Sequence, residues 1–126
     1  MKRNFQILLF VAFCLVAIPA VSAQSRVTGV FGGFTANKQS GDLDGMRIMI
    51  FNAGNEYHAI VQIAGGGAED PTPVFVPVTV KGRTISFTVE SGKYTGTVSA
   101  AGLRIKQEGE RGASELLRRK PCTTYF

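Results

Sequence analysis

The stretch from Val74 to Ile105 constrains the fold more than any other part of the chain, because apolar and polar residues alternate along it between short turn signals. Alternation with a period of two sends successive side chains to opposite faces of a β-strand. The turn signals are Lys81-Gly82, Ser91-Gly92 and Ala101-Gly102. The stretch therefore predicts four consecutive antiparallel strands, with one face buried and the other exposed to water.

The N-terminal segment has the three-part layout of a secretory signal peptide. Lys2 and Arg3 give a positive start, Ile7 to Ile18 form an apolar run, and Val21-Ser22-Ala23 supplies small side chains. The apolar run is shorter than the roughly 20 residues that a membrane-spanning helix needs. We therefore expect a signal peptide over residues 1–23, cleavage after Ala23, a secreted or periplasmic protein, and no transmembrane segment in the mature chain.

The expected mature chain is a single domain with a mild positive charge. Cleavage would leave 103 of the 126 residues, enough for one modest core. Losing Lys2 and Arg3 from 14 basic residues leaves 12 against 9 acidic ones, a net charge of +3. An excess of this size is typical of a solvated surface, with an anionic partner or membrane surface as the alternative. A secreted protein of this kind is not expected to bind nucleic acid.

The two cysteines limit the covalent possibilities. Cys14 lies inside the signal, and Phe13 before it disfavours lipoprotein processing, which takes a small residue there. Cys122 is then the lone thiol of the mature chain, so no intramolecular disulfide is possible. A lone thiol in an oxidising compartment is buried, free or paired with another chain. The place of Cys122 in the C-terminal tail favours exposure and predicts a minor disulfide-linked dimer.

The rest of the mature chain continues the sheet. The predicted strands are Arg26–Phe34, Met46–Phe51, Tyr57–Ile63, Val74–Val80, Thr84–Val89, Lys93–Val98, Leu103–Lys106 and Ser114–Arg119. The last of these could instead be a short helix. Pro77 has no N–H to donate to a neighbouring strand. It therefore lies at a sheet edge or a bulge, or its missing N–H faces away from the neighbouring strand. The prediction is an all-β fold, a small eight-stranded antiparallel up-and-down (meander) barrel whose closure removes both exposed edges.

Side chains suited to catalysis or metal binding are scarce. The one histidine, His58, shares a strand face with Glu56, and a hydrolase would need a third polar group to meet them in a concave site. Asp42-Leu43-Asp44-Gly45 resembles part of a calcium loop, but apolar strand residues follow it. Gly65-Gly66-Gly67 lacks the lysine and helix of a phosphate-binding loop. We expect no enzyme, no metal and no cofactor.

Two short motifs near the ends of the mature chain resemble those of the calycins, the small barrels that include lipocalins, avidins and some bacterial protease inhibitors. Gly29-Val30-Phe31 looks like their first-strand Gly-x-Trp, with phenylalanine in place of tryptophan. Leu117-Arg118-Arg119 looks like the segment of their last strand that supplies a basic residue. The resemblance implies that Phe31 and Arg118 close one end of the barrel, with the cation over the ring. The chain has no tryptophan, so the likeness is architectural.

The calycin resemblance implies binding inside the barrel mouth. Eight short strands leave little interior, since their own side chains nearly fill it, although glycines such as Gly96 could leave a slot. The candidate pocket residues are Met46, Ile48, Tyr57, Ile85, Phe87 and Tyr94. The leading expectation is a secreted or periplasmic, non-enzymatic barrel that binds a small apolar ligand or a protein partner through its open end and loops.

An enzyme inhibitor or interaction module that acts through its loops is the alternative. The protease inhibitors among the calycins use an N-terminal trunk and a disulfide, whereas Gln24-Ser25-Arg26 is short and no disulfide is available. Ser91-Gly92-Lys93-Tyr94 is similar to the Ser-Gly-Ala-basic-Tyr loop of bacterial lysozyme inhibitors with one residue missing. A tight hairpin turn explains the same tetrapeptide. The lysozymes that such inhibitors bind are themselves basic, so their charge would repel the net positive charge of this chain.

Overall fold

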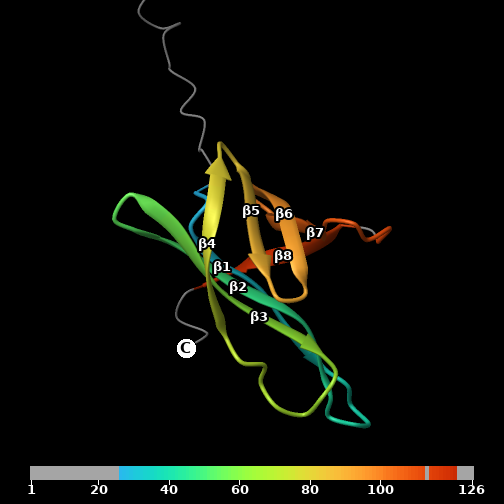
Figure 1. Ribbon diagram of the computed structural model, residues 1–126. Helices are drawn as coiled ribbons and strands as arrows, with labels where there is room; N and C mark the ends of the chain where they lie inside the picture. The colour runs from blue at the N-terminus through green and yellow to red at the C-terminus, as the bar shows by residue number, and fades with distance from the viewer. Residues whose placement is uncertain (1–25, 113, 122–126) are drawn as a thin grey trace, which may run out of the picture.

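The protein is a closed barrel of eight antiparallel strands in up-and-down order (Figure 1). The computed structural model describes residues 26–112 and 114–121. The strands are β1 (Gly29–Ala36), β2 (Leu43–Ala53), β3 (Glu56–Gly65), β4 (Val74–Lys81), β5 (Thr84–Val89), β6 (Gly92–Ser99), β7 (Gly102–Gln107) and β8 (Glu115–Lys120). The predicted fold class is confirmed, and the last segment is a strand rather than a helix. The predicted signal peptide and Cys122 lie outside the described residues.

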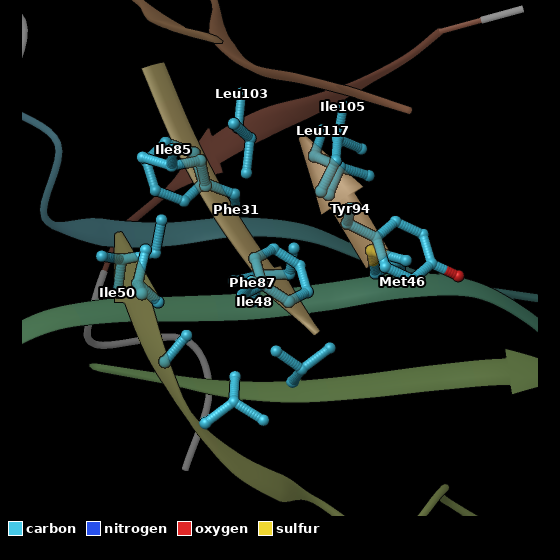
Figure 2. Close-up of a cluster of buried hydrophobic side chains, with 14 of the residues drawn as sticks. Phe31, Met46, Ile48, Ile50, Ile85, Phe87, Tyr94, Leu103, Ile105 and Leu117 are labelled. Atoms are coloured by element: carbon cyan, nitrogen blue, oxygen red, sulfur yellow. The ribbon is translucent and has the colours of Figure 1, made fainter. Parts of the chain in front are cut away.

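Period-two alternation places one face of every strand in the barrel interior. In β2, Met46, Ile48 and Ile50 are buried while Arg47 and Met49 between them are partly exposed. The same alternation along the other strands completes a single core, which consists of Phe31, Met46, Ile48, Ile50, Ala59, Val61, Val76, Val78, Ile85, Phe87, Tyr94, Val98, Leu103, Ile105 and Leu117. Figure 2 shows side chains from different strands converging on this interior. No helix in the described ranges is long and apolar enough to cross a membrane.

Two glycines of the barrel strands, Gly32 and Gly96, leave no empty space where their side chains would be. A Cβ on Gly32 would collide with the Met46 carbonyl oxygen. A Cβ on Gly96 would lie 2.7 Å from Leu103 Cδ1 and 2.9 Å from the Arg104 carbonyl oxygen. Neighbouring strands therefore use the space that these glycines leave, so that the slot considered from the sequence is absent at both positions.

Strand β4 is paired with a different neighbour in each of its halves. Its first half, Val74 to Val78, is paired with β3, and its second half, Thr79 to Lys81, is paired with β5. Pro77 lies opposite His58 of β3, and no residue of β5 is paired with it. A residue without an N–H is tolerated there because the ladder on the β5 side is already open. Pro77 is therefore at a local edge, one of the two positions that the sequence allowed.

The two ends of the barrel differ. We call the mouth the end that carries the β1–β2 turn (residues 37–42), the β3–β4 loop (66–73), the β5–β6 turn (90–91) and the β7–β8 connection. The opposite end, the base, is where β1 begins and β8 ends, and where Val30 and Phe31 pair with Lys120 and Arg119. The longest connection lies at the mouth, while short turns join the strands at the base.

A cation over an aromatic ring closes the base, as the calycin resemblance implies, but the arginine is one residue later than predicted. Arg119 Cζ lies 4.7 Å from the centre of the Phe31 ring. Its guanidinium also donates hydrogen bonds to the carbonyl oxygens of Thr28 (2.8 Å) and Arg26 (2.6 Å). Leu117 points into the core, so that alternation sends Arg118 outward and returns Arg119 to the inner side. The predicted pair of Phe31 with Arg118 is therefore corrected to Phe31 with Arg119.

Replacement of Arg119 tests this closure. Arg119→Ala removes the contact with Phe31 and both hydrogen bonds to the segment before β1, and we expect the free energy of unfolding to fall by about 1–2 kcal/mol. Arg118→Ala is the matched control, with an expected change within about 0.5 kcal/mol for an exposed side chain. Urea denaturation followed by circular dichroism measures both. Equal losses in the two variants would contradict the assignment.

Candidate binding site at the barrel mouth

A hollow of about 380 Å³ opens at the mouth above the filled core. Its lining residues are Val61, Ile63, Thr72, Val74, Val89, Glu90 and Ser91. Val61 and Ile63 belong to β3, Val74 begins β4 and Val89 ends β5. Four aliphatic side chains thus form the walls, and the three polar residues lie in the loops at the rim. This distribution is typical of small-molecule sites, in which a few polar groups orient a largely apolar ligand.

Unequal strand lengths produce the hollow. β2 and β3 have 11 and 10 residues, whereas β5 has only 6. The inward-facing residues at the mouth end of β3 and β4 therefore project beyond the end of β5. Val61 remains 1% exposed, but Val74 is 44% exposed because nothing on the β5 side covers it. The apolar pattern of a buried strand consequently continues into a region that has no opposite wall.

A polar clasp on the outer wall holds the β3–β4 loop beside the hollow. Gln62 Oε1 accepts hydrogen bonds from Arg47 Nε (2.9 Å) and Nη2 (2.7 Å), and Gln62 Nε2 donates to the Pro71 carbonyl oxygen (2.7 Å). Arg47 Cζ also lies 4.8 Å from the centre of the Phe34 ring. Gln62 is only 7% exposed, so each of these bonds satisfies a group that has left water. The clasp fixes Pro71 and thereby places Thr72 and Val74 at the rim.

A second clasp holds the β5–β6 turn on the other side of the hollow. The Tyr94 hydroxyl donates to Gln107 Oε1 (3.1 Å) and lies 3.3 Å from Ser91 Oγ. Gln107 Nε2 donates to the Ser91 carbonyl oxygen (2.6 Å). The Tyr94 ring stacks on Phe87 with centroids 5.5 Å apart. Figure 2 shows the ring among the core side chains with its hydroxyl at their margin. Tyr94 thus connects the core to the turn that carries Glu90 and Ser91.

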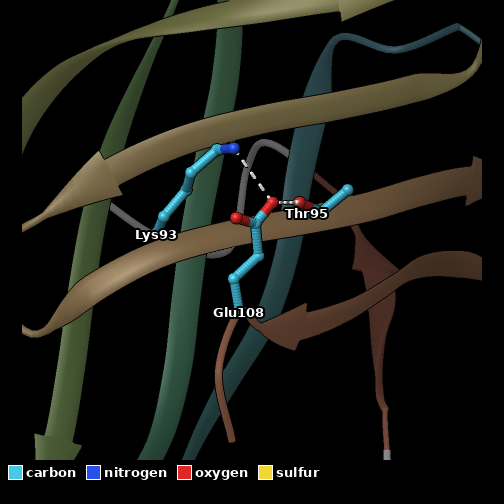
Figure 3. A network of polar contacts seen from close by, with 3 residues as sticks. All are labelled: Lys93, Thr95 and Glu108. Atoms are coloured by element: carbon cyan, nitrogen blue, oxygen red, sulfur yellow. Dashed lines mark hydrogen bonds and ion pairs between the residues drawn. The ribbon is translucent and has the colours of Figure 1, made fainter.

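A third polar contact joins β6 to the end of β7 (Figure 3). Glu108 Oε1 accepts a hydrogen bond from Thr95 Oγ1 (2.8 Å) and lies 3.0 Å from the Lys93 ammonium. The hydrogen bond from the Thr95 hydroxyl, followed by the contact with the Lys93 ammonium, holds the pKa of Glu108 below its ordinary value. The Glu108 amide also donates to the Lys93 carbonyl oxygen (2.8 Å). These bonds continue the ladder past β7 and keep the β6 side of the mouth in place.

The six candidate pocket residues predicted from the sequence lie in or against the core. Met46, Ile48, Ile85, Phe87 and Tyr94 belong to the buried cluster, and Tyr57 packs against it. Ile48 and Ile85 have no exposed surface. None of the six lines the mouth hollow or the second hollow described below. The structure therefore brings these residues together as packing for the interior beneath the site.

His58 and Glu56 lie on strand β3, away from both hollows. The His58 ring stacks on Phe75, with centroids 4.9 Å apart, and lies 6.2 Å from the Phe51 ring. These three side chains form a cluster on the outer wall, which we call the outer aromatic cluster. His58 Nδ1 is buried and has no hydrogen-bond partner within the described chain. The His58 ring is therefore stacked with the aromatic rings of Phe51 and Phe75 in this cluster.

A second hollow, of about 520 Å³, lies beside the β1–β2 turn. Asp42 and Asp44 line it, together with residues 35–37, 43, 65 and 66. Asp44 Oδ1 accepts a hydrogen bond from the Gly45 amide (2.9 Å). The described ranges contain no group of three or more histidine, cysteine, aspartate or glutamate side chains that could hold a metal ion. The segment that resembles part of a calcium loop thus forms the turn and the start of β2.

Sequence reasoning identified the inward faces of β3, β4 and β5 but not the residues of the hollow. Period-two alternation places Val61 with Ile63 on one face of β3 and Val74 on one face of β4, but it does not indicate which end of a strand lacks an opposite wall. Thr72, Glu90 and Ser91 belong to loops, where no periodicity operates. One signal was present: the longest Gly- and Pro-containing connection, residues 65–73, marks the end at which the strands are least closely joined.

Removal of the outer clasp tests how the loop is held. Gln62→Leu keeps an apolar body of similar size but loses the bonds to Arg47 and Pro71, and we expect a loss of about 1–3 kcal/mol in the free energy of unfolding. Amide hydrogen exchange in residues 66–73 should also accelerate. Gln39→Leu, the same change at an exposed turn residue, is the control. Unchanged exchange in the loop of the Gln62 variant would contradict the role of the clasp.

The Glu108 contact predicts a specific pH dependence. A carboxyl group whose pKa is lowered by folding stabilises the protein above the ordinary pKa of 4.5, and this stabilisation is lost as the pH falls through the folded value. We therefore expect Glu108→Gln to melt at a lower temperature than the wild type at pH 7 and at nearly the same temperature near pH 2. Thermal melts across this pH range measure the difference. A gap that widens on acidification would contradict the assignment.

Comparison with known proteins adds no identification to this geometry. The chain matches no family model, and neither curated proteins nor solved structures give a significant match. The functional proposal therefore rests on the barrel itself.

Proposed function

We propose that this chain is a secreted or periplasmic, non-enzymatic, calycin-like binding protein that takes a small apolar ligand in the hollow at its mouth. The observation that carries the proposal is the aliphatic lining of the hollow by Val61, Ile63, Val74 and Val89. Its volume of about 380 Å³ lies at the small end of the usual range for ligand sites, roughly 300–1,000 Å³. When a ligand covers apolar surface that is exposed to water in a concave site, the free energy of the system falls.

The geometry favours a compact ligand with one polar group. The filled core beneath the hollow limits how deep a ligand can reach, so a long acyl chain does not fit lengthwise along the barrel axis. The apolar body would lie against the four aliphatic walls. A hydroxyl or amine at its outer end would meet Thr72, Glu90 and Ser91, which lie at the rim. The two clasps through Gln62 and Tyr94 hold both sides of the rim before binding, which reduces the entropic cost of association.

A second candidate function is an interaction module, such as a secreted enzyme inhibitor, that acts through the mouth and the adjacent wall. The observation that favours it is the exposure of large apolar side chains beside the hollow, 44% for Val74 and 62% for Phe75. Phe75 belongs to the outer aromatic cluster, with its ring 6.0 Å from that of Phe51. Exposed apolar surface of this kind is typical of protein contacts.

Titration with small compounds tests the leading proposal. We would add 1-octanol, indole and 2-naphthol separately to the ¹⁵N-labelled protein, and search for copurified ligand by native mass spectrometry. At least one compound should shift amide signals of the lining residues, and we expect a dissociation constant in the micromolar to millimolar range. The proposal fails if no compound perturbs these residues and no ligand copurifies.

A pair of neighbouring lysine substitutions provides the matched control. Val89→Lys places a charge against the aliphatic walls, and burial of an unpaired charge is costly, so binding should weaken by at least about tenfold. Thr88→Lys adds the same charge at the adjacent outward-facing position of β5 and should leave binding unchanged. Circular dichroism checks that both variants fold. Equal binding by both variants would place the ligand elsewhere.

A further inference from the structure

The barrel wall contains a strand edge that is open on one side. Residues Val74 to Val78 of β4 are paired with β3, but the pairing of β4 with β5 begins only at Thr79. Figure 1 shows the two strands meeting near their connecting turn and separating in the other direction, toward the mouth. The hollow lies at this opening, since Val74 of β4 and Val89 of β5 both line it. We call the opening between these two strand segments the seam.

An open edge of this kind is an energetic liability. Backbone N–H and C=O groups that have no strand partner on one side are a template for another extended chain, and proteins usually cover such edges or protect them with charged side chains. Val74 to Val78 carry no charge, and Val74 and Phe75 are the exposed large apolar residues of the described chain. Pro77 removes one donor, which weakens the edge without covering it.

We propose that the seam binds an extended peptide segment of a partner protein, which pairs with Val74 to Val76, the mouth end of β4, as an added strand and places alternate side chains in the mouth hollow. The inference rests on the proposed function in one respect, because the same hollow would receive the apolar side chains. It adds that backbone hydrogen bonds along β4 provide the recognition. Pairing with an exposed sheet edge is a general mode of peptide binding, with affinity from the main chain and specificity from alternate side chains.

The chemistry of the seam defines the peptide. Three paired residues of β4, Val74 to Val76, correspond to an extended segment of about 10 Å. Peptide side chains on the inner face would meet the walls formed by Val61, Ile63 and Val89 and should therefore be aliphatic. Those on the outer face would adjoin Phe75, which is 62% exposed.

Charge complementarity predicts which type of residue lies at the mouth end of the peptide. Glu90 lines the hollow, and Glu69 and Asp70 lie in the exposed β3–β4 loop. No lysine or arginine is among the residues that line the hollow. A lysine or arginine at the mouth end of the peptide would therefore be attracted to this rim.

A separate peptide fits the seam better than a second copy of the barrel. In a symmetric dimer, the β4 edges of two barrels would have to approach each other directly. Each edge is flanked by β5 of its own barrel, which converges on β4 at Thr79 and narrows the approach. A single extended segment has no such flanking wall and can enter the seam from the mouth.

Selection from a random octapeptide phage library on the purified, immobilised protein tests the proposal. We expect enriched peptides with aliphatic residues at alternate positions and a basic residue at one end. A synthetic enriched peptide should bind Thr88→Lys as it binds the wild type, and should bind Val89→Lys at least about tenfold more weakly. Absence of enrichment, or equal binding by the two variants, would overturn the proposal.

Two further measurements separate strand pairing from simple burial of side chains. Methylation of alternate backbone nitrogens of the peptide, on the edge that faces β4, should weaken binding at least about tenfold, because each lost bond has a cost. Peptide addition should slow amide exchange across Val74–Val76 and leave exchange in β6 unchanged. If the methylated peptide binds equally well, the strand proposal fails, whereas the small-ligand proposal stands or falls on its own titration. A concentration-dependent dimer that excludes the peptide would overturn the proposal in favour of a second copy.

Discussion

Closure of an eight-stranded sheet is the constraint on which the rest of this structure depends. Each strand has to hydrogen-bond with two neighbours and send alternate side chains into one narrow interior. Apolar residues such as Ile48, Ile85 and Leu103 occupy that interior and have no exposed surface. Where strands must approach closely, glycines take the place of larger residues, as Gly32 does against the Met46 carbonyl oxygen. At the base, Arg119 lies over Phe31 and seals the end at which β1 and β8 pair through only two residue pairs.

The mouth differs because the strands that form it are unequal. β3 extends beyond β5, so residues with the alternation of a buried strand lie where no opposite strand covers them. Side-chain hydrogen bonds through Gln62 and Tyr94 hold the β3–β4 loop and the β5–β6 turn on either side. The hollow follows from this mismatch in strand length. The seam has a second cause, because β5 diverges from β4 beyond the Thr79–Ser86 pair although it continues to Val89.

Much of the architecture could be predicted from the sequence because period-two alternation is a local signal. The strand from Thr84 to Val89 was predicted with its observed bounds, and the inward set that includes Ile85 and Phe87 was identified from spacing alone. Register is less local. The arginine that contacts Phe31 was placed one residue early, because the motif contains two adjacent arginines and only the pairing of Phe31 with Arg119 distinguishes them.

The candidate site was harder to predict for a related physical reason. Met46 and Phe87 have the same apolar character as Val74 and Val89. Composition does not reveal which of these side chains are covered by opposite strands and which lie beyond the ends of those strands. That distinction depends on where β5 ends relative to β3, a property of the assembled barrel. The rim residues Glu90 and Ser91 depend further on the conformation of a turn. Inward-facing residues next to the longest loop are thus better candidates for a mouth site than the bulkiest residues of the strands.

Xenon binding distinguishes a filled barrel interior from one with empty apolar space, and it shows whether the hollow at the mouth is open to an apolar ligand. Xenon occupies apolar cavities without requiring hydrogen bonds. In a crystal pressurised with xenon, we expect a xenon atom against Val61, Val74 and Val89, and none among Phe31, Ile48 and Ile85. Xenon bound within the latter group, or an unoccupied mouth hollow beside an occupied interior, would contradict this expectation.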